Sequence, residues 1–308
     1  MEVSNADQQL FQDNVELQLQ QGEVGNPLEE AVVWTDDASA EKIKVKDIFA
    51  AKRAKSATER NGKTVWDDPD NDGVWLPKTD ELYEAILIEN ADKLKTAISL
   101  EGASTMITAA TLNRAKIRRV LEGFAGPIIS GKSGTVSTPL GTQGQVAATV
   151  GGASGDQPLN IKKIRQANVY LKQGFNPKYL KRYMVVTAED CDALLDEVNA
   201  TSEDFKKTFG AKYDADGNLI GILGFNFIEI ELDDPDLDTI PDLYTSGTNR
   251  INPFWVKGGL VGNYWQRLRS HIGKLPERRF NEGTLGGTTL AATRTQPGRC
   301  GFILNKKQ

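Results

Sequence analysis

The segment that most resembles a site of chemistry is residues 126–133, which read GPIISGKS. Its Gly126, Gly131, Lys132 and Ser133 occupy every fixed position of the pattern G-x-x-x-x-G-K-[ST], in which loop amides and a lysine hold nucleotide phosphates. A working loop of this kind leaves a strand and opens a helix, because the helix N-terminus faces the phosphates. Here a predicted helix precedes the motif and a loop rich in Thr, Pro and Gly follows it. We therefore interpret the match as coincidental and keep a P-loop nucleotide hydrolase as the alternative function.

A second motif, DPDNDG at residues 68–73, copies the first half of a calcium-binding loop. Acidic ligands stand at its first, third and fifth positions and a glycine at its sixth. The bidentate glutamate that completes such a loop is missing, because Thr79 occupies the twelfth position. An Asx-rich turn in a hairpin is the better interpretation, with an ion site as the alternative. Residues 214–218 are interpreted as a plain turn.

The remaining reactive residues are sparse. His271 is the only histidine, and Cys191 and Cys300 are the only cysteines, which is little material for a catalytic triad, a zinc site or a disulfide framework. Seven carboxylates lie between residues 229 and 242. Paired acids for acid–base chemistry are one meaning of this run, and a solvated acidic loop is the commoner one. The sequence therefore predicts no enzyme, no cofactor, and no catalytic or metal-binding residue.

The longest helical pattern spans residues 103–124 and ends directly before the glycine- and lysine-containing motif. Apolar residues spaced three, four or seven apart line one face of this helix: Met106, Ala110, Ile117, Leu121 and Phe124. The opposite face is basic, with residues that are either solvated or meet acidic partners: Arg114, Lys116, Arg118 and Arg119. Ser104 or Thr105 is expected to cap the start, and Gly126 with Pro127 to end the helix. At about 1.5 Å per residue it is roughly 33 Å long, enough to form the spine of a domain.

Charge is distributed unevenly along the chain, although the net charge is only -5. Residues 1–41 hold ten acids and no Lys or Arg, whereas residues 249–308 hold eleven bases against Glu277 and Glu282. Ends of opposite sign can pair within one chain or between copies, or form two solvated surfaces. Arg278 and Arg279 belong to the basic end.

Other segments alternate in type. Residues 1–27 form a polar arm that is too thin to fold alone, and residues 31–76 look like a long two-stranded excursion. Strands are predicted at residues 82–89 and 183–187, and helices at residues 159–173 and 188–198, with a Gly- and Ser-rich boundary loop over residues 130–158. Residues 220–231 indicate a strand pair or one long bent strand. No run approaches the roughly 18 apolar residues of a membrane span, and we expect no signal peptide.

Three stretches resemble the major capsid proteins of tailed bacteriophages, those of the Hong Kong 97 fold. Residues 81–98 are similar to the segment that enters the spine helix of one large coat-protein group. Residues 159–171 with 182–189 resemble that group's helix, strand and helix of the axial domain. Residues 221–228, GILGFNFI, resemble a later strand signature.

The resemblance implies an α+β fold with an N-terminal arm (1–27), an extended loop (28–80), a peripheral domain with the spine helix (81–150), an axial domain (151–252), and return strands that complete both domains (253–308). It also implies a structural capsid protein that tiles as hexamers and pentamers into an icosahedral or prolate head around double-stranded DNA. Separate scaffolding, portal and decoration proteins are the expected partners, with non-specific contact to DNA and no membrane. Such a protein is made in the host bacterial cytoplasm and ends in the virion. Two groups become candidates for assembly: Met106, Ile117, Leu121 and Phe124 on the spine, and Arg278 and Arg279 as bases that face another subunit or DNA.

Overall fold

The computed structural model describes residues 27–37, 40–45, 63–64, 73–88, 100–131, 133–152, 155–174, 176–197, 209–215 and 217–307. Several sequence-based predictions fall outside this part of the chain. They concern the arm over residues 1–26, the acidic run at residues 68–72, and Lys132.

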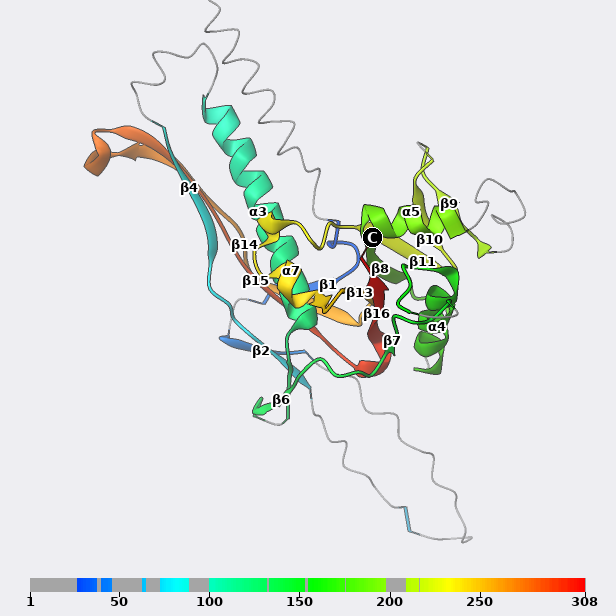
Figure 1. Ribbon diagram of the computed structural model, residues 1–308. Helices are drawn as coiled ribbons and strands as arrows, with labels where there is room; N and C mark the ends of the chain where they lie inside the picture. The colour runs from blue at the N-terminus through cyan, green and yellow to red at the C-terminus, as the bar shows by residue number, and fades with distance from the viewer. Residues whose placement is uncertain are drawn as a thin grey trace, which may run out of the picture.

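A long, narrow sheet and one helix form the elongated half of the molecule (Figure 1). The strand order is β1 (Val33–Thr35), β14 (Leu260–Leu275), β15 (Asn281–Arg294) and β4 (Leu82–Ile88). Strands β14 and β15 form an antiparallel hairpin whose tip is the short 3₁₀ helix η2 (Pro276–Arg278). Helix α3 (Leu100–Ala125) packs along one face of this sheet, mainly against β15. The close approach depends on Gly123, because a Cβ there would lie 2.2 Å from the carbonyl oxygen of Ala292.

Helix α3 confirms the predicted spine, with one correction at its start. The helix begins at Leu100, so Ser104 and Thr105 lie inside it and do not cap it. Leu100 and Glu101 are good helix formers and extend the helix beyond the apolar pattern. The end is as predicted: the Gly126 amide makes the last helical hydrogen bond, 2.8 Å to Glu122 O, and Pro127 follows.

A second sheet of eight strands forms the other half of the molecule (Figure 1). Its order is β7 (Gln145–Val146), β16 (Cys300–Lys306), β13 (Asn249–Val256), β8 (Arg182–Val186), β11 (Phe225–Glu229), β10 (Leu219–Ile222) and β9 (Lys212–Tyr213), with β12 (Thr245–Ser246) beside β13. Helices α4 (Ile161–Gln173) and α5 (Ala188–Glu197) pack on one face of it. The predicted helices and the strand at 183–187 are therefore confirmed within one or two residues.

Strand β8 is buried on both faces, which explains its uninterrupted apolar sequence. Tyr183 and Val185 face the core that contains Leu121 and Phe124 of α3, whereas Met184 and Val186 face the core under α4. Residues 220–231 are a strand pair, β10 and β11. Their two-residue turn, Leu223 and Gly224, has positive φ at both positions, as in tight hairpins.

A small third sheet covers part of the long sheet. It contains β2 (Lys42–Val45), β3 (Val74–Pro77), β5 (Ile128–Ser130) and β6 (Val136–Thr138). Strands β2 and β3 pair antiparallel at the base of the predicted excursion. Leu76 of β3 packs on Trp265 and Ala291, on the face of the long sheet that α3 does not touch.

Candidate assembly surfaces

The predicted apolar face of the spine lies inside the subunit. The exposed fractions of Ile117, Leu121 and Phe124 are 6%, 1% and 1%, and the side chain of Met106 lies outside the described part. The Phe124 ring packs at a tilt against Trp255, with 5.8 Å between centroids, and Tyr244 donates a hydrogen bond of 2.8 Å to Leu121 O. These residues therefore connect the spine to the eight-stranded sheet.

On the outer side of the spine, part of the basic face meets carboxylates. Arg118 Nη1 lies 3.0 Å from Asp238, and Arg119 Nη1 lies 3.1 Å from Glu122. The sequence left open whether this face is solvated or meets acidic partners, and these two arginines meet acidic partners.

A buried arginine connects the acidic stretch to the eight-stranded sheet. Arg250 is 3% exposed, and its Nε donates a hydrogen bond of 2.9 Å to Asp233. Its Nη1 bonds Thr187 Oγ1 at 2.7 Å and its Nη2 bonds Glu189 at 2.8 Å, while Asp190, itself 3% exposed, lies 3.7 Å away. The single positive charge of the guanidinium thus lies close to three carboxylates.

The expectation of a solvated loop over residues 229–242 is therefore wrong for several of its acids. Glu231 accepts a hydrogen bond of 2.8 Å from the amide of Ala188 at the start of α5, and Asp233 binds Arg250 and Lys307. Burial by itself raises the pKa of Asp233, but the hydrogen bonds from Lys307 and Arg250 outweigh it and hold that pKa below its usual range. Partners that lie far away in sequence, such as Lys307, could not be inferred from the run of acids.

A second buried polar chain begins at Lys163, which is 0% exposed. Its Nζ donates to two main-chain carbonyl oxygens, at 2.6 and 2.7 Å, and to Asn305 Oδ1 at 3.1 Å. Asn305 donates to Asn252, and Asn252 donates to Asp190 at 2.6 Å. Burial lowers the pKa of Lys163 to about 8, although the charges of Asp190 and Asp156 act in the opposite direction. The sequence analysis missed this network; its one signal is polar residues 250 and 252 at alternate positions of an apolar strand.

Some of the charge asymmetry is resolved by pairing within the chain. Arg267 makes two hydrogen bonds of 2.8 Å to Asp36, and Lys181 binds Glu30. The Arg267–Asp36 pair therefore joins the acidic end and the basic end of the sequence within one subunit, beside the β1–β14 pair, whereas Lys181 lies outside the basic end.

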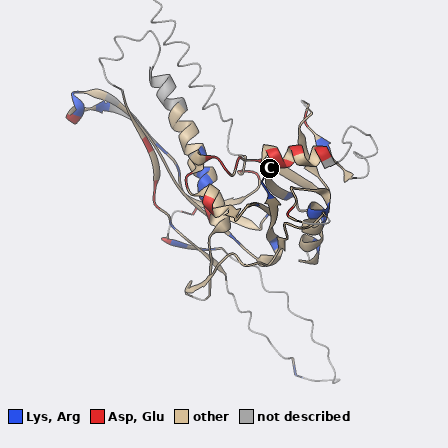
Figure 2. Ribbon diagram, in the orientation of Figure 1, with Lys and Arg blue, Asp and Glu red and all other residues tan. Residues whose placement is uncertain are grey.

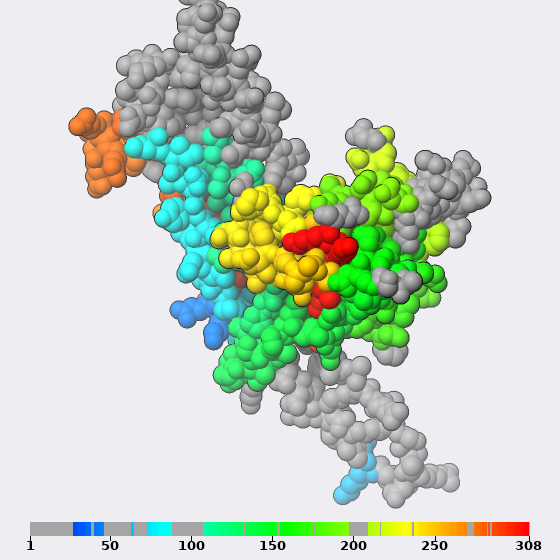
Figure 3. Space-filling view, in the orientation of Figure 1, coloured from blue at the N-terminus to red at the C-terminus, as the bar shows by residue number. Residues whose placement is uncertain are grey.

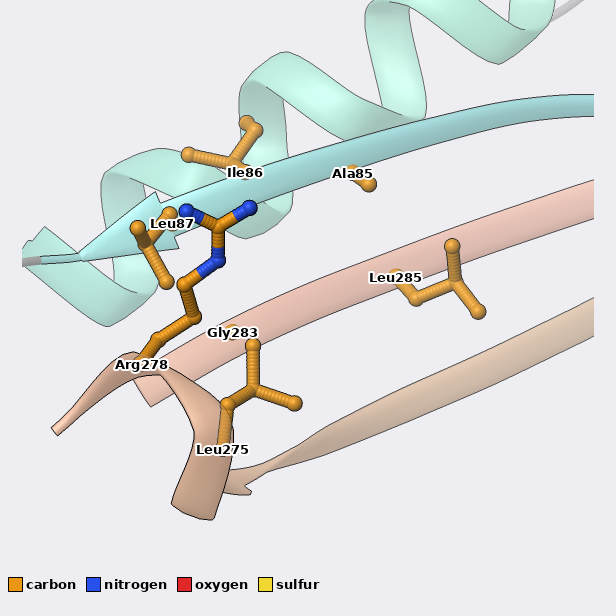
Figure 4. A pocket seen from close by; sticks show the side chains of 7 residues that line it. All are labelled: Ala85, Ile86, Leu87, Leu275, Arg278, Gly283 and Leu285. Carbon is orange, nitrogen blue, oxygen red and sulfur yellow. The ribbon is translucent and has the colours of Figure 1, made fainter. Parts of the chain in front are cut away.

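Arg278 and Arg279 lie at the far tip of the β14–β15 hairpin, which stands apart from the body (Figures 2 and 3). Arg279 and Phe280 both have left-handed φ, 55° and 57°, and Phe280 is 62% exposed. Arg278 lines an adjacent groove of about 440 Å³ whose other walls are mainly apolar (Figure 4). A tip that presents apolar and basic side chains to solvent is suited to contact another macromolecule.

Comparison with known proteins decides what this architecture serves. The sequence profile of the phage capsid protein family matches residues 3–307. This chain belongs to the phage capsid protein family. A search of curated proteins finds no match.

Solved capsids have the same fold at low sequence identity. The capsid structure of cyanophage P-SCSP1u gives a TM-score of 0.65 at 10% identity, covering 90% of this chain and 87% of that chain. The capsid of a native GTA particle gives 0.60 at 13% identity, covering 92% and 91%. The capsid of Ralstonia phage GP4 gives 0.60 at 10% identity, covering 90% and 87%.

The capsid protein therefore has the Hong Kong 97 type of α+β fold, as the resemblance implied. It is a structural major capsid protein of the virion shell, where it associates with copies of itself, and it is not an enzyme. No helix in the described part of the chain is long and apolar enough to span a membrane.

The phosphate-loop motif of the capsid protein is a β-hairpin. Residues 128–130 form β5 and residues 136–138 form β6, which pairs antiparallel with β5, so a strand and not a helix follows the motif. Gly126 ends α3, and Gly131 O accepts a hydrogen bond of 2.7 Å from Trp75 Nε1. Ser133 lies in the turn, and Lys132 lies outside the described residues. The motif thus lacks the helix N-terminus that a phosphate site needs.

Lys132→Ala is expected to leave assembly intact and to change nothing in ATP binding, because wild type should bind no ATP above background. Isothermal titration with magnesium ATP, at protein concentrations that detect millimolar affinity, checks this. Magnesium-dependent ATP binding that disappears in the variant would support the nucleotide hydrolase hypothesis.

Other candidates from the sequence are also structural. Asp214 N bonds Asn218 O at 2.9 Å, which makes residues 214–218 the predicted turn between β9 and β10. Cys191 and Cys300 are both free, and burial raises the pKa of the Cys300 thiol to about 11. Within the described residues, no cluster of three or more His, Cys, Asp or Glu side chains could hold a metal ion.

Proposed function

We propose that this major capsid protein tiles as hexamers and pentamers into a closed icosahedral or prolate head that encloses phage double-stranded DNA. The match of the family profile over residues 3–307 carries the proposal. Separate scaffolding, portal and decoration proteins complete the head, DNA is contacted without sequence specificity, and synthesis takes place in the host bacterial cytoplasm.

Within the subunit, we propose the division that the sequence suggested. The arm (1–27) and the extended loop (28–80) reach neighbouring subunits, and the spine region (81–150) with the axial region (151–252) forms the body. Residues 253–308 return to both, which is supported by β13 and β16 in the eight-stranded sheet and β14 and β15 in the long sheet.

The spine residues Met106, Ile117, Leu121 and Phe124 serve assembly indirectly in this proposal, by keeping the two halves of the subunit in one orientation. Burial of Ile117, Leu121 and Phe124 supports this role. Arg278 and Arg279 serve it directly, as contacts to another subunit. An apolar groove beside Arg278 favours a protein partner over DNA, since phosphates would gain nothing from leucine walls.

Negative-stain images and mass photometry of the purified full-length protein test the proposal. Closed particles, or rings of five or six subunits, are the expected species. A small discrete species under all salt and protein concentrations would contradict it, and magnesium-dependent ATP binding by that species would support the nucleotide hydrolase instead.

A further inference from the structure

The outer face of the long sheet is covered near the body and open near the tip. Near the body, Leu76 of the small sheet packs on Trp265 and Ala291. Farther out, no described element covers this face, and the exposed fractions of Tyr83 and Leu87 on β4 are 68% and 43%. The open part is an apolar surface on a strand pair that α3 supports from behind.

This surface contains a groove at a glycine of β15. In β15 the even-numbered residues face α3, since a Cβ on Gly286 would meet Thr108 and Leu112, so Gly283 and Leu285 face outward. A Cβ on Gly283 would lie 2.8 Å from Leu275 Cδ1, and the absence of a side chain there leaves the groove (Figure 4). Its walls are Leu87, Leu275 and Leu285, with Ala85 and Ile86 beside them.

The rim of the groove is basic. Arg278 lies against Leu87 in Figure 4, and it pairs with no carboxylate among the described side chains. Lys274 and Arg279 are exposed on the same hairpin tip, so with Arg278 it carries three bases against two acids, Glu277 and Glu282, the second of which pairs with Lys274 in the strand register. The groove therefore fits a segment that combines large apolar side chains with negative charge.

The two longest stretches that lie wholly or almost wholly outside the described residues are candidates for its occupant, and their charges separate them. Residues 46–72, of which the structure describes only 63–64, contain six acids and six bases, and so are neutral overall. Residues 1–26 contain five acids and no Lys or Arg, and their apolar residues Phe11, Val15 and Leu19 are spaced four apart, on one face of a helix. Charge and apolar pattern both favour residues 1–26.

The position of Leu28, which follows the arm in the sequence, indicates which copy supplies the arm that fills the groove. Leu28 is 0% exposed and belongs to the core that contains Val120 and Leu121, on the α3 side of the long sheet. The groove opens on the opposite side. An arm that filled the groove of its own subunit would have to pass around a sheet edge, whereas the arm of another copy need not.

We propose that the groove formed by Leu87, Leu275, Gly283 and Leu285 binds the acidic, amphipathic residues 1–26 of a second copy, with Arg278 as the charge partner. This rests on the proposed shell function and adds a specific contact to it.

Photo-crosslinking in the full-length protein tests the contact. An unlabelled chain with p-benzoylphenylalanine in place of Phe11 is assembled together with ¹⁵N-labelled wild-type chain, irradiated, digested and analysed by mass spectrometry. The expected product joins the unlabelled peptide that contains residue 11 to a ¹⁵N-labelled peptide from residues 82–88 or 275–285. Because only the unlabelled chain carries the probe, this product can arise only between copies.

Two variants of the labelled chain make the test specific. Gly283→Leu fills the groove and Arg278→Glu reverses its charge, and each should lower the yield of this product about tenfold, the factor that 1.4 kcal/mol of binding free energy gives. Gly141→Leu is the control, because a Cβ there meets nothing within 4 Å, and it should leave the yield unchanged.

Three results would each overturn the inference. The probe could crosslink only to unlabelled groove peptides, it could crosslink only to other parts of the chain, or it could give no crosslink in particles that assemble normally. Failure to form any rings or particles would instead refute the proposed function, and the inference with it.

Discussion

Replacing Ile117 and Leu121 together with alanine is expected to yield insoluble or unassembled protein. Both side chains are nearly inaccessible, at 6% and 1%, in the core that joins the spine to the eight-stranded sheet. Truncating a buried large aliphatic side chain costs about 2 to 5 kcal/mol, and a whole domain is stable by only about 5 to 15 kcal/mol. The double variant therefore removes much or all of the stability. The soluble fraction after expression and the urea midpoint of any soluble protein measure the effect.

Lys116→Ala is the matched control on the same helix, because its side chain is only partly buried and lies on the basic face. It should shift the urea midpoint little, as substitutions away from the core usually change stability by less than about 0.5 kcal/mol. Equal losses in the control and the double variant would mean that the apolar face has been assigned wrongly.

Arg250→Met is expected to lower the free energy of unfolding by about 3 to 5 kcal/mol, since it takes the guanidinium away from the buried carboxylate of Asp190 and from the partly buried carboxylate of Asp233. Asp190 is 3% exposed and loses the guanidinium that lies 3.7 Å away. Asp233 loses hydrogen bonds from two guanidinium nitrogens and keeps only Lys307. Methionine keeps much of the volume, which separates the loss of charge from the loss of packing. Chemical denaturation at neutral pH followed by circular dichroism measures the difference.

Arg267→Met removes an equally well-formed bidentate pair, with Asp36, from the surface, where the arginine side chain is 57% exposed. Exposed pairs contribute about 0 to 1 kcal/mol, so this variant should be nearly as stable as wild type. If the Arg250 variant loses no more stability than the Arg267 variant, the buried network does not hold the acidic stretch (229–242) to the eight-stranded sheet.

The pH dependence provides a second readout for the Arg250 network. The folded-state pKa of Asp233 is depressed, so its stabilising contribution is present above the carboxyl's usual pKa and is lost as pH falls through the folded value. Wild type should therefore lose more stability than Arg250→Met on moving from neutral pH into this acidic range. If wild type and Arg250→Met lose stability equally as the pH falls, the Arg250–Asp233 pair is not the source of the acid sensitivity.

The sequence by itself determined most of the features that depend on short spacing along the chain. The spine, strand β4 and the strand–helix pair β8 and α5 follow from apolar periodicity and from stop signals such as Gly126 with Pro127. The phosphate-loop motif could also be rejected, because the order of elements around it is a local property. The start of the spine was placed too late, since Ser104 and Thr105 are as compatible with a helix interior as with a cap.

Only the tertiary structure decided which distant residues meet. Arg250 could be counted as one base among eleven, but its pairing with Asp233, Glu189 and Thr187 depends on the order of strands in the eight-stranded sheet. The groove at the tip is likewise absent from any single segment. The groove exists at Gly283 because β4 pairs with β15 on one side and Leu275 of β14 lies close by on the other. It stays open because the small sheet packs only nearer the body. Such features arise from strand register and sheet coverage, which bring together Leu87 and Gly283 in the groove, and Arg250 with residues 17 to 63 positions away. They leave no periodic signal in the sequence.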